Sequence, residues 1–218
     1  SDAELTAALA TIEDGDTIYL AGASFGAFDL SALRNKTDVT IVGIAGAKVA
    51  GTYRSKTNDV VTTNLTFKGI TFTAKVSTEN CKVNGITVDG CKFVDGAWLL
   101  LTGYGSGALD GATVQNCVFE NTAKKALSVQ NASKNVVIKN NTFTNCGTNA
   151  IHADTVSGDY LVEGNVINGT GDRALRFGTK TGANITIKDN VITNGFDSDG
   201  EVVKVDGEVI AATVSGNT

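Results

Sequence analysis

The feature that most constrains this 218-residue chain is an internal repeat of about 24 residues. Its clearest copy is NVVIKNNTFTNC at 135–146, in which apolar and polar residues alternate, two asparagines follow, and a second short alternation begins. Internal repetition at a fixed period indicates a stacked architecture. Further copies of the pattern lie at 65–72, 86–93, 112–119, 160–167, 185–192 and 212–218.

The length of the repeat predicts what each unit contains. It leaves room for three short strands joined by turns and is too short for two helices. One such unit cannot bury its own apolar face, so the repeats are expected to stack as coils of a solenoid. Equivalent residues then lie one above another at the spacing of neighbouring strands, roughly 4.8 Å.

The residue after the turn in each repeat predicts what the interior of the stack contains. In three earlier repeats it is Ile70, Cys91 and Cys117. In the last four it is asparagine, and a buried amide without partners would be costly. These side chains are therefore expected to hydrogen-bond along the axis. The predicted ladder comprises Asn141, Asn165, Asn190 and Asn217.

The repeated pattern V-x-I-x-[ND]-N-x-[FI]-x-N, followed by a glycine-containing turn and a short apolar strand, resembles right-handed parallel β-helix proteins of the pectate-lyase-like superfamily. The resemblance covers nearly all of the chain and implies an all-β solenoid of about eight coils. It does not specify an activity, because this fold carries lyases, hydrolases, phage tailspikes, adhesins and inert virion proteins. The motifs of polygalacturonases are absent, so the resemblance is to the tailspike, virion or surface-protein type.

The N-terminus carries the signals of a capping helix. Ser1 and Glu4 have capping-box spacing, and Leu5, Leu9 and Ile12 share one helical face. A helix over 1–14 is expected to cover the apolar end of the first coil, with coils over 15–218. The stretch 48–61 is less regular and is predicted to carry a surface loop. Neither a linker nor a change of composition divides the chain, which predicts one domain over 1–218.

Charge and hydropathy narrow the partners and the location. The net charge is −5 and the pI is near 4.9, which argues against nucleic acid as a partner. No apolar run is long enough to span a membrane, and no signal-peptide pattern is visible. A start at Ser1 fits the loss of either an initiator methionine or a leader. A virion or an extracellular or cell-surface location is expected.

The four cysteines leave two interpretations open. Cys91 and Cys117 occupy equivalent positions in adjacent repeats, so a disulfide between them is sterically allowed. The alternative, which we favour, is a stack of buried free thiols, because a buried cysteine behaves as a small hydrophobe. The spacings do not match those of Cys/His metal sites.

The best candidate site follows from the resemblance, which implies a substrate groove along the strand after the longer turn of each coil. Those strands are 98–102, 126–130, 150–154, 174–178 and 202–206. Alternation sends every second side chain outward. The outward column is Leu100, Ser128, His152, Arg176 and Lys204.

This column suggests binding or cleavage of an acidic polysaccharide. The catalytic candidates are His152, Arg176 and Lys204, with arginine or lysine as the base of a β-elimination, as the resemblance to pectate lyases implies. The alternative is a solvated sheet face on which acidic and basic side chains pair across coils. The ligand-binding candidates are Trp98, Ser128, Asp154, Arg173 and Asp206.

The turn FDSDGE supplies weak candidates for a Ca²⁺ site, namely Asp197, Asp199 and Glu201, because Ca²⁺ prefers several converging carboxylates. A solvated acidic turn is the alternative interpretation. No other cofactor is expected.

Two classes of function and one narrower hypothesis follow. The first is a non-catalytic structural or adhesive module displayed on a virion or cell surface. The rival is a polysaccharide lyase acting on an acidic glycan, and the third is a glycan-binding module that uses Trp98, Tyr104 and the outward column. The last coil, 203–218, is expected to expose apolar residues and a strand edge, which predicts contact with another protein chain, a homo-oligomer included.

Overall fold

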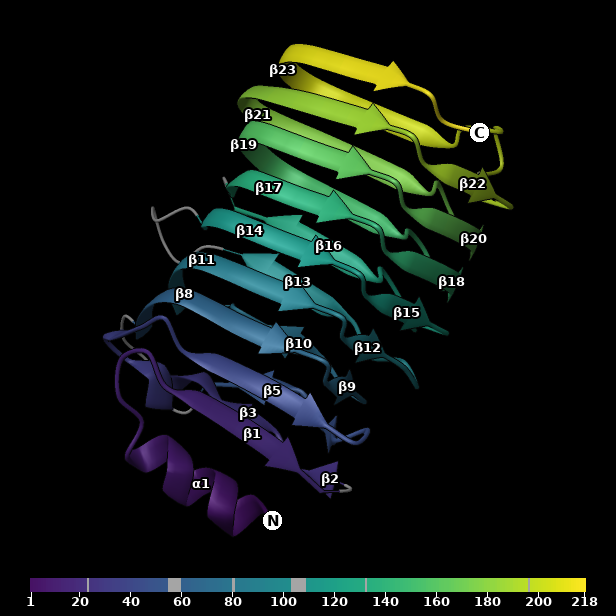
Figure 1. The fold of residues 1–218 in the computed structure, drawn as a ribbon. Helices are drawn as coiled ribbons and strands as arrows, with labels where there is room; N and C mark the ends of the chain where they lie inside the picture. The colour runs from purple at the N-terminus through teal and green to yellow at the C-terminus, as the bar shows by residue number, and fades with distance from the viewer. Residues whose placement is uncertain (23, 55–59, 80, 103–108, 132, 196) are drawn as a thin grey trace.

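The computed structural model describes the chain except residues 23, 55–59, 80, 103–108, 132 and 196, and except the side chains of residues 60, 180 and 181. It is a parallel β-helix whose coils follow one another along a rod, with the N-terminal helix at one end and the last strand at the other (Figure 1). The predicted all-β solenoid of about eight coils is confirmed.

Each coil contributes to three faces. The first face holds β1 (Thr17–Ala21), β5 (Thr40–Ile44), β8 (Val60–Lys68), β11 (Cys81–Asp89), β14 (Asp110–Gln115) and β17 (Lys134–Lys139), with β4 (Lys36–Thr37) beside β8. The second holds β2 (Ser24–Phe25), β6 (Lys48–Val49), β9 (Thr71–Phe72), β12 (Lys92–Phe93), β15 (Val118–Glu120), β18 (Thr142–Cys146), β20 (Val166–Thr170) and β22 (Val191–Thr193). The third holds β3 (Phe28–Asp29), β7 (Thr52–Tyr53), β10 (Val76–Ser77), β13 (Leu99–Thr102) and β16 (Leu127–Gln130). The long strands β19 (Ile151–Glu163), β21 (Leu175–Lys188) and β23 (Val203–Ser215) continue from the third face into the first.

The turn between the first and second faces explains why one position of the repeat is always Gly, Asn or Asp. Its first residue has a positive φ, between 56° and 65° in seven coils. Glycine adopts this conformation without a steric penalty, and asparagine and aspartate tolerate it better than other residues. The seven residues are Gly69, Gly90, Asn116, Asn140, Gly164, Asp189 and Gly216.

Aromatic rings fill the interior behind the second face. Four phenylalanines stack along the axis, with ring centroids 5.2, 4.5 and 4.8 Å apart, and all are buried. Ile167 continues the same column in the next coil. Such ring stacking stabilises the core beyond the burial of apolar area alone. The four rings belong to Phe72, Phe93, Phe119 and Phe143.

The predicted asparagine ladder is present beside this column. Within it, Oδ1 of each later member accepts hydrogen bonds from both the backbone N–H and the side-chain amide of the member one coil earlier, at 2.8–3.0 Å. At the start of the ladder, the Oδ1 atom of Asn141 accepts from the backbone N–H of Cys117 at 2.9 Å. The members are Asn141, Asn165, Asn190 and Asn217.

The N-terminal cap is shorter than predicted. Helix α1 (Asp2–Ala10) ends before 11–14, because the Thr11 hydroxyl bonds to carbonyls of the last turn and Asp16 accepts the Glu13 N–H at 2.7 Å in the turn that follows. Leu5 and Leu9 are buried against the first coil, as expected. Across the described residues, no helix is long and apolar enough to cross a membrane.

The stretch 48–61 includes the short strands β6 and β7, whose residues pair with the coils on either side. Residues 55–59, where the predicted surface loop would lie, are outside the described residues. The disulfide between Cys91 and Cys117 does not form, and the favoured interpretation of buried free thiols is confirmed. The Cys117 thiol donates to the carbonyl oxygens of Val88 and Gln115 instead.

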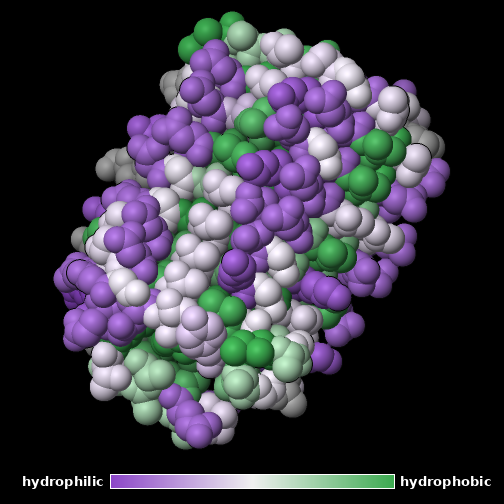
Figure 2. All heavy atoms as spheres, viewed as in Figure 1, coloured by the Kyte–Doolittle hydropathy of each residue, from purple (hydrophilic) through white to green (hydrophobic). Residues whose placement is uncertain are grey.

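The C-terminal end of the rod exposes apolar side chains. Strand β23 pairs with β21, and within the described chain no strand pairs with its other edge. Val209, Ile210 and Val214 are 39, 72 and 57 % exposed. Figure 2 shows polar side chains over much of the visible side of the rod and apolar atoms at its upper end, where Figure 1 places β23.

Candidate functional site

The predicted outward column forms on the third face. Ser128 pairs in register with His152, His152 with Arg176, and Arg176 with Lys204. Leu100 precedes Ser128 in the same column. The repeat arithmetic therefore aligned these side chains correctly, although they lie about 24 residues apart in the chain.

Three of the five residues of this column are not accessible, which corrects the prediction that the column faces solvent. Leu100, Ser128 and His152 are buried, with 6, 0 and 5 % exposure. Gln130 donates a hydrogen bond to the Ser128 hydroxyl at 3.1 Å and lies beside it. Alternation gives the direction of a side chain, but neighbouring long side chains can still cover it. Arg176 is exposed and Lys204 is half-buried.

His152 is the most perturbed titratable group on this face. Burial, followed by the positive charges of Lys125 and Arg176, lowers its pKa to about 4, although Asp154 and Asp172 act in the opposite direction. Its Nδ1 atom is buried and has no hydrogen-bond partner. A base with so low a pKa is mostly neutral at pH 7 but binds a proton weakly, which makes it a poor general base there.

Arg173, a predicted ligand-binding residue, is engaged by acids of its own chain. Its guanidinium lies 2.5 Å from an oxygen of Asp197, 2.6 Å from one of Glu201 and 3.3 Å from one of Asp172. Planar guanidinium groups suit such multiple carboxylate contacts. The cluster joins two adjacent coils and closes the turn that carries Asp197 and Glu201.

This cluster changes the interpretation of the acidic turn. Two of the three Ca²⁺ candidates, Asp197 and Glu201, face Arg173, and Asp199 is exposed. Asp197 also accepts backbone N–H bonds from Asp199 and Glu201 at 2.9 and 2.8 Å. Throughout the described residues, no three His, Cys, Asp or Glu side chains gather in a way that could hold a metal ion.

The remaining predicted residues are dispersed. Asp154 and Asp206 are exposed in the neighbouring outward column, and Asp206 lies 3.7 Å from the Lys204 ammonium. Trp98 is half-buried, with the Lys75 ammonium 5.7 Å from its ring centroid. Tyr104 lies outside the described residues. The structure thus aligns the candidates without gathering them around one hollow.

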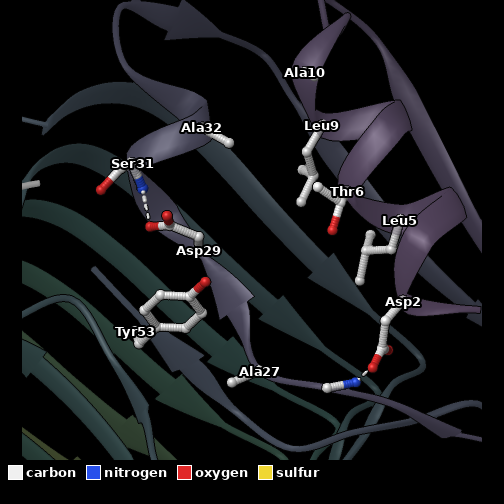
Figure 3. A pocket seen from close by; sticks show the side chains of 11 residues that line it. Asp2, Leu5, Thr6, Leu9, Ala10, Ala27, Asp29, Ser31, Ala32 and Tyr53 are labelled. Atoms are coloured by element: carbon white, nitrogen blue, oxygen red, sulfur yellow. Dashed lines mark hydrogen bonds between the residues drawn. The ribbon is translucent and has the colours of Figure 1, made fainter. Parts of the chain in front are cut away.

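Sequence reasoning missed a surface hollow with a volume of about 590 Å³. It lies between α1 and the segment that includes β3 and the 3₁₀ helix η1 (Leu30–Leu33), and Tyr53 closes its far side (Figure 3). Tyr53 also borders a smaller hollow of about 260 Å³ beside Arg54, Lys75 and Glu79. The sequence offers only a tyrosine at position 53, and its place across from the helix could not be read from the repeat.

Comparison with known proteins gives one family and one structural similarity. The family model for the right-handed beta helix region matches residues 73–218. Among curated proteins, no relative matches the chain. A solved structure of the surface protein and adhesin PfbA of Streptococcus pneumoniae is similar, with a TM-score of 0.48 and 11 % sequence identity, over 94 % of this chain and 86 % of that one.

Proposed function

The chain belongs to the right-handed β-helix family, and on that premise we propose that it is a non-catalytic structural or adhesive module displayed at the surface of a cell or virion. Such a module needs a stiff rod, polar sides that face solvent, and contact sites that bind a partner without catalysing a reaction. The fold class alone does not decide between this role and catalysis, because β-helices serve both.

The observation that carries the proposal is the state of the face where a groove was expected. Ser128 and His152 are buried, and the Arg173 guanidinium is bound by carboxylates from two coils. A substrate would have to displace these intramolecular contacts before it could use the same groups. The cost would include leaving a guanidinium or carboxylates without partners in a partly buried setting.

The interior supports a mechanical role. The phenylalanine column links the coils from Phe72 to Phe143 by ring stacking, and the asparagine ladder links the coils from Asn141 to Asn217 by side-chain hydrogen bonds. About eight coils at the strand spacing give a rod of roughly 40 Å. A rod of this kind holds what it carries at a fixed distance from its base.

The proposed partner contact is the exposed edge of β23. Its apolar residues and open strand edge suit an added β-strand layer from another protein chain, whether a second copy or a further domain. The contact would pair backbone groups and cover Ile210 and Val214 at the same time. Polysaccharide contacts along the sides remain part of the adhesive proposal, whereas nucleic acid and membrane insertion are not proposed.

The cysteines are compatible with display outside a cell. Burial raises the pKa of the Cys81 and Cys146 thiols to about 11 each, so little thiolate is present at pH 7. Since the thiolate is the reactive form, these buried groups resist oxidation without a disulfide. Free buried thiols are therefore compatible with the proposed surface location.

The rival function is cleavage of an acidic glycan with Arg176 or Lys204 as base. It is favoured by the accessibility of Arg176, which lies in register between His152 and Lys204. Purified protein should be incubated with a panel of uronic-acid polymers, with and without Ca²⁺, and unsaturated products followed by ultraviolet absorbance. We expect no cleavage.

A matched variant makes that experiment decisive. Replacing both Arg176 and Lys204 with alanine should leave the fold intact, which circular dichroism can verify. Polymer cleavage by the wild type that this variant loses would overturn the non-catalytic proposal. Cleavage that persists in the variant would also overturn it and would place the base elsewhere.

A further inference from the structure

The turn of the last coil, at Gly216 and Asn217, presents two adjacent backbone donors. In six earlier coils the N–H of the first turn residue donates to a carbonyl oxygen one coil later, as Asp189 does to Ser215 at 3.1 Å. In four coils the next N–H donates to an asparagine Oδ1 one coil later, as Asn190 does to Asn217 at 2.9 Å. Among the described residues, the N–H groups of Gly216 and Asn217 have no such acceptor. By equivalence with the earlier coils, both are directed at the positions of acceptors in a further layer.

The inward-facing side chains of β23 lose their cover at the same end of the rod. Leu175 and Ile187 of β21 are fully buried. Their register partners in β23 are Val203, which is half-buried, and Val214, which is exposed. A further layer would cover the inward side chains of β23 as β23 covers those of β21. Burial of this apolar surface would favour the contact.

The two ends of the rod differ, which limits what a second copy of this chain can do there. At the N-terminal end, α1 lies over the first coil, and its Leu5 and Leu9 are buried (Figure 1). That end of one copy cannot stack on β23 of another unless the helix moves away. In a two-fold contact between C-terminal ends, the Oδ1 of each Asn217 already accepts two hydrogen bonds from Asn190 of its own chain. A second copy can therefore cover apolar side chains but does not complete the ladder.

We propose that the C-terminal end binds the exposed first coil of a different protein with the same fold, which adds a layer parallel to β23. A backbone carbonyl of that coil accepts from Gly216, and the Oδ1 of an asparagine two residues further on accepts from Asn217. Ser215 and Asn217 supply the same pair of acceptors to the coil before them. Addition of a strand to an open sheet edge is a common mode of recognition. This inference rests on the proposed structural or adhesive function and specifies the partner at the edge of β23.

The hydrogen-bonding groups around this turn select asparagine in the partner. Each ladder asparagine donates through Nδ2 to a carbonyl oxygen of the coil before it, as Asn217 does to Ile187 at 3.0 Å. By register, the equivalent carbonyl for the partner's asparagine is that of Val214. Leucine in the partner would satisfy neither group, whereas aspartate would accept from Asn217 but could not donate to Val214. Asparagine supplies both interactions without burying a charge.

The test attaches a defined coil to the full chain, because covalent linkage removes the cost of bringing a separate partner to the end. A copy of residues 167–191 is added directly after Thr218. Thr218 and Val166 both follow a ladder asparagine, so the added coil continues the repeat in phase. Two matched extensions carry leucine or aspartate in place of the copied Asn190. They differ from the first only in the group offered to the open end.

Amide hydrogen exchange, followed by NMR, reports on the two open donors directly. With the asparagine extension, exchange at Gly216 and Asn217 should slow at least tenfold relative to the wild-type chain. With the leucine extension, exchange at Asn217 should be at least fivefold faster than with the asparagine extension. The aspartate extension retains the acceptor, so at pH 7 Asn217 should exchange more slowly than with leucine. Exchange at Asn141, inside the ladder, should be the same in all four chains and serves as the control.

Three results would overturn the inference. The first is unchanged exchange at Gly216 and Asn217 with the asparagine extension. The second is exchange at Asn217 that is as fast with aspartate as with leucine, or as slow with leucine as with asparagine. The third is equal protection of both groups in the wild-type chain as its concentration rises, which would make a second copy the occupant. Polymer cleavage would refute the non-catalytic role and leave these results standing, whereas failure of the added coil to dock would leave that role intact.

Discussion

Oδ1 of Asn165 accepts two hydrogen bonds from Asn141, one from the backbone N–H and one from the side-chain amide, both 3.0 Å long. Both residues are buried, with 0 and 1 % exposure. The same oxygen therefore satisfies a main-chain donor that the turn leaves without a strand partner, and a side-chain donor inside the core. At the same turn, backbone bonds from Asn140 N–H to the Glu163 carbonyl and from Val166 N–H to the Asn141 carbonyl also join the two coils, at 3.0 and 2.8 Å.

Replacing Asn165 with leucine should reduce the free energy of unfolding by about 2–4 kcal/mol, because each buried polar group left without a partner costs about 1–3 kcal/mol. The groups affected are the two donors of Asn141 and the carbonyl of Ile138, which accepts from Asn165 at 3.0 Å. Urea unfolding measures the loss. Asn168→Leu is the control, because Asn168 is exposed in the same coil, and it should cost less than about 0.5 kcal/mol. Equal effects would contradict the ladder.

Asn140 should tolerate glycine and reject valine. Its φ is 56°, a conformation that costs a β-branched residue about 1–2 kcal/mol and costs glycine almost nothing in the folded state. Thermal unfolding of Asn140→Val, Asn140→Gly and the neighbouring exposed Thr142→Val would separate backbone strain from side-chain loss. If Asn140→Val and Thr142→Val melted together, the turn would not require a left-handed residue.

His152 should make stability depend on pH between about 4 and 6.5. Its folded pKa is about 4 and its ordinary value is 6.5, so the unfolded chain binds the proton more readily in this range. Stability should therefore fall as pH drops through this window, and the change should level off below pH 4. Allowing for solvent screening, we expect a contribution of about 1–2 kcal/mol.

The measurement is direct, because the chain has a single histidine. Proton NMR of the imidazole resonances of His152 as a function of pH gives its pKa in the folded protein. His152→Gln should show a flatter dependence of unfolding free energy on pH from 4 to 6.5 than the wild type. A folded pKa of 6.5 or above would show that the ring is not shielded as described.

Charged residues at the open end should affect association and leave the fold unchanged. Ile210 and Val214 are 72 and 57 % exposed, so Ile210→Lys with Val214→Lys should change the unfolding free energy by less than about 0.5 kcal/mol. Sedimentation velocity at rising concentration should show less self-association than in the wild type. Strong hydrogen-exchange protection of 203–214 in a wild-type sample that is demonstrably monomeric would show that this edge needs no partner.

Much of the fold could be predicted from the repeat, because in a solenoid the repeat period determines which residues of neighbouring coils pair. Asn140 and Asn141 mark the turn in the clearest copy, and counting coils from them put His152 beside Arg176 correctly. The burial of the outward side chains could not be predicted in the same way. Ser128 points outward but is covered, since alternation carries no information about what neighbouring long side chains do.

The pairing of Arg173 with Asp197 was also available in principle. The two residues are 24 positions apart, one coil, but one was interpreted as a ligand-binding residue and the other as a Ca²⁺ candidate. Tyr53 could not have been placed in the same way. It lies in a two-residue strand too short to show alternation, and the hollow depends on where α1 crosses the first coil, which the repeat does not encode.

The constant step between coils makes the length of this rod independent of the side chains on its faces. Thr142 pairs with Val166, and each follows a ladder asparagine. Excision of 142–165 would join Asn141 to Val166 and set its amide below that of Asn190, the neighbour that Asn165 has now. Genetic gain or loss of whole coils would thus alter length in increments of about 4.8 Å, while point substitutions alter only the side chains that the faces present. The length of the rod and the composition of its faces can therefore evolve separately.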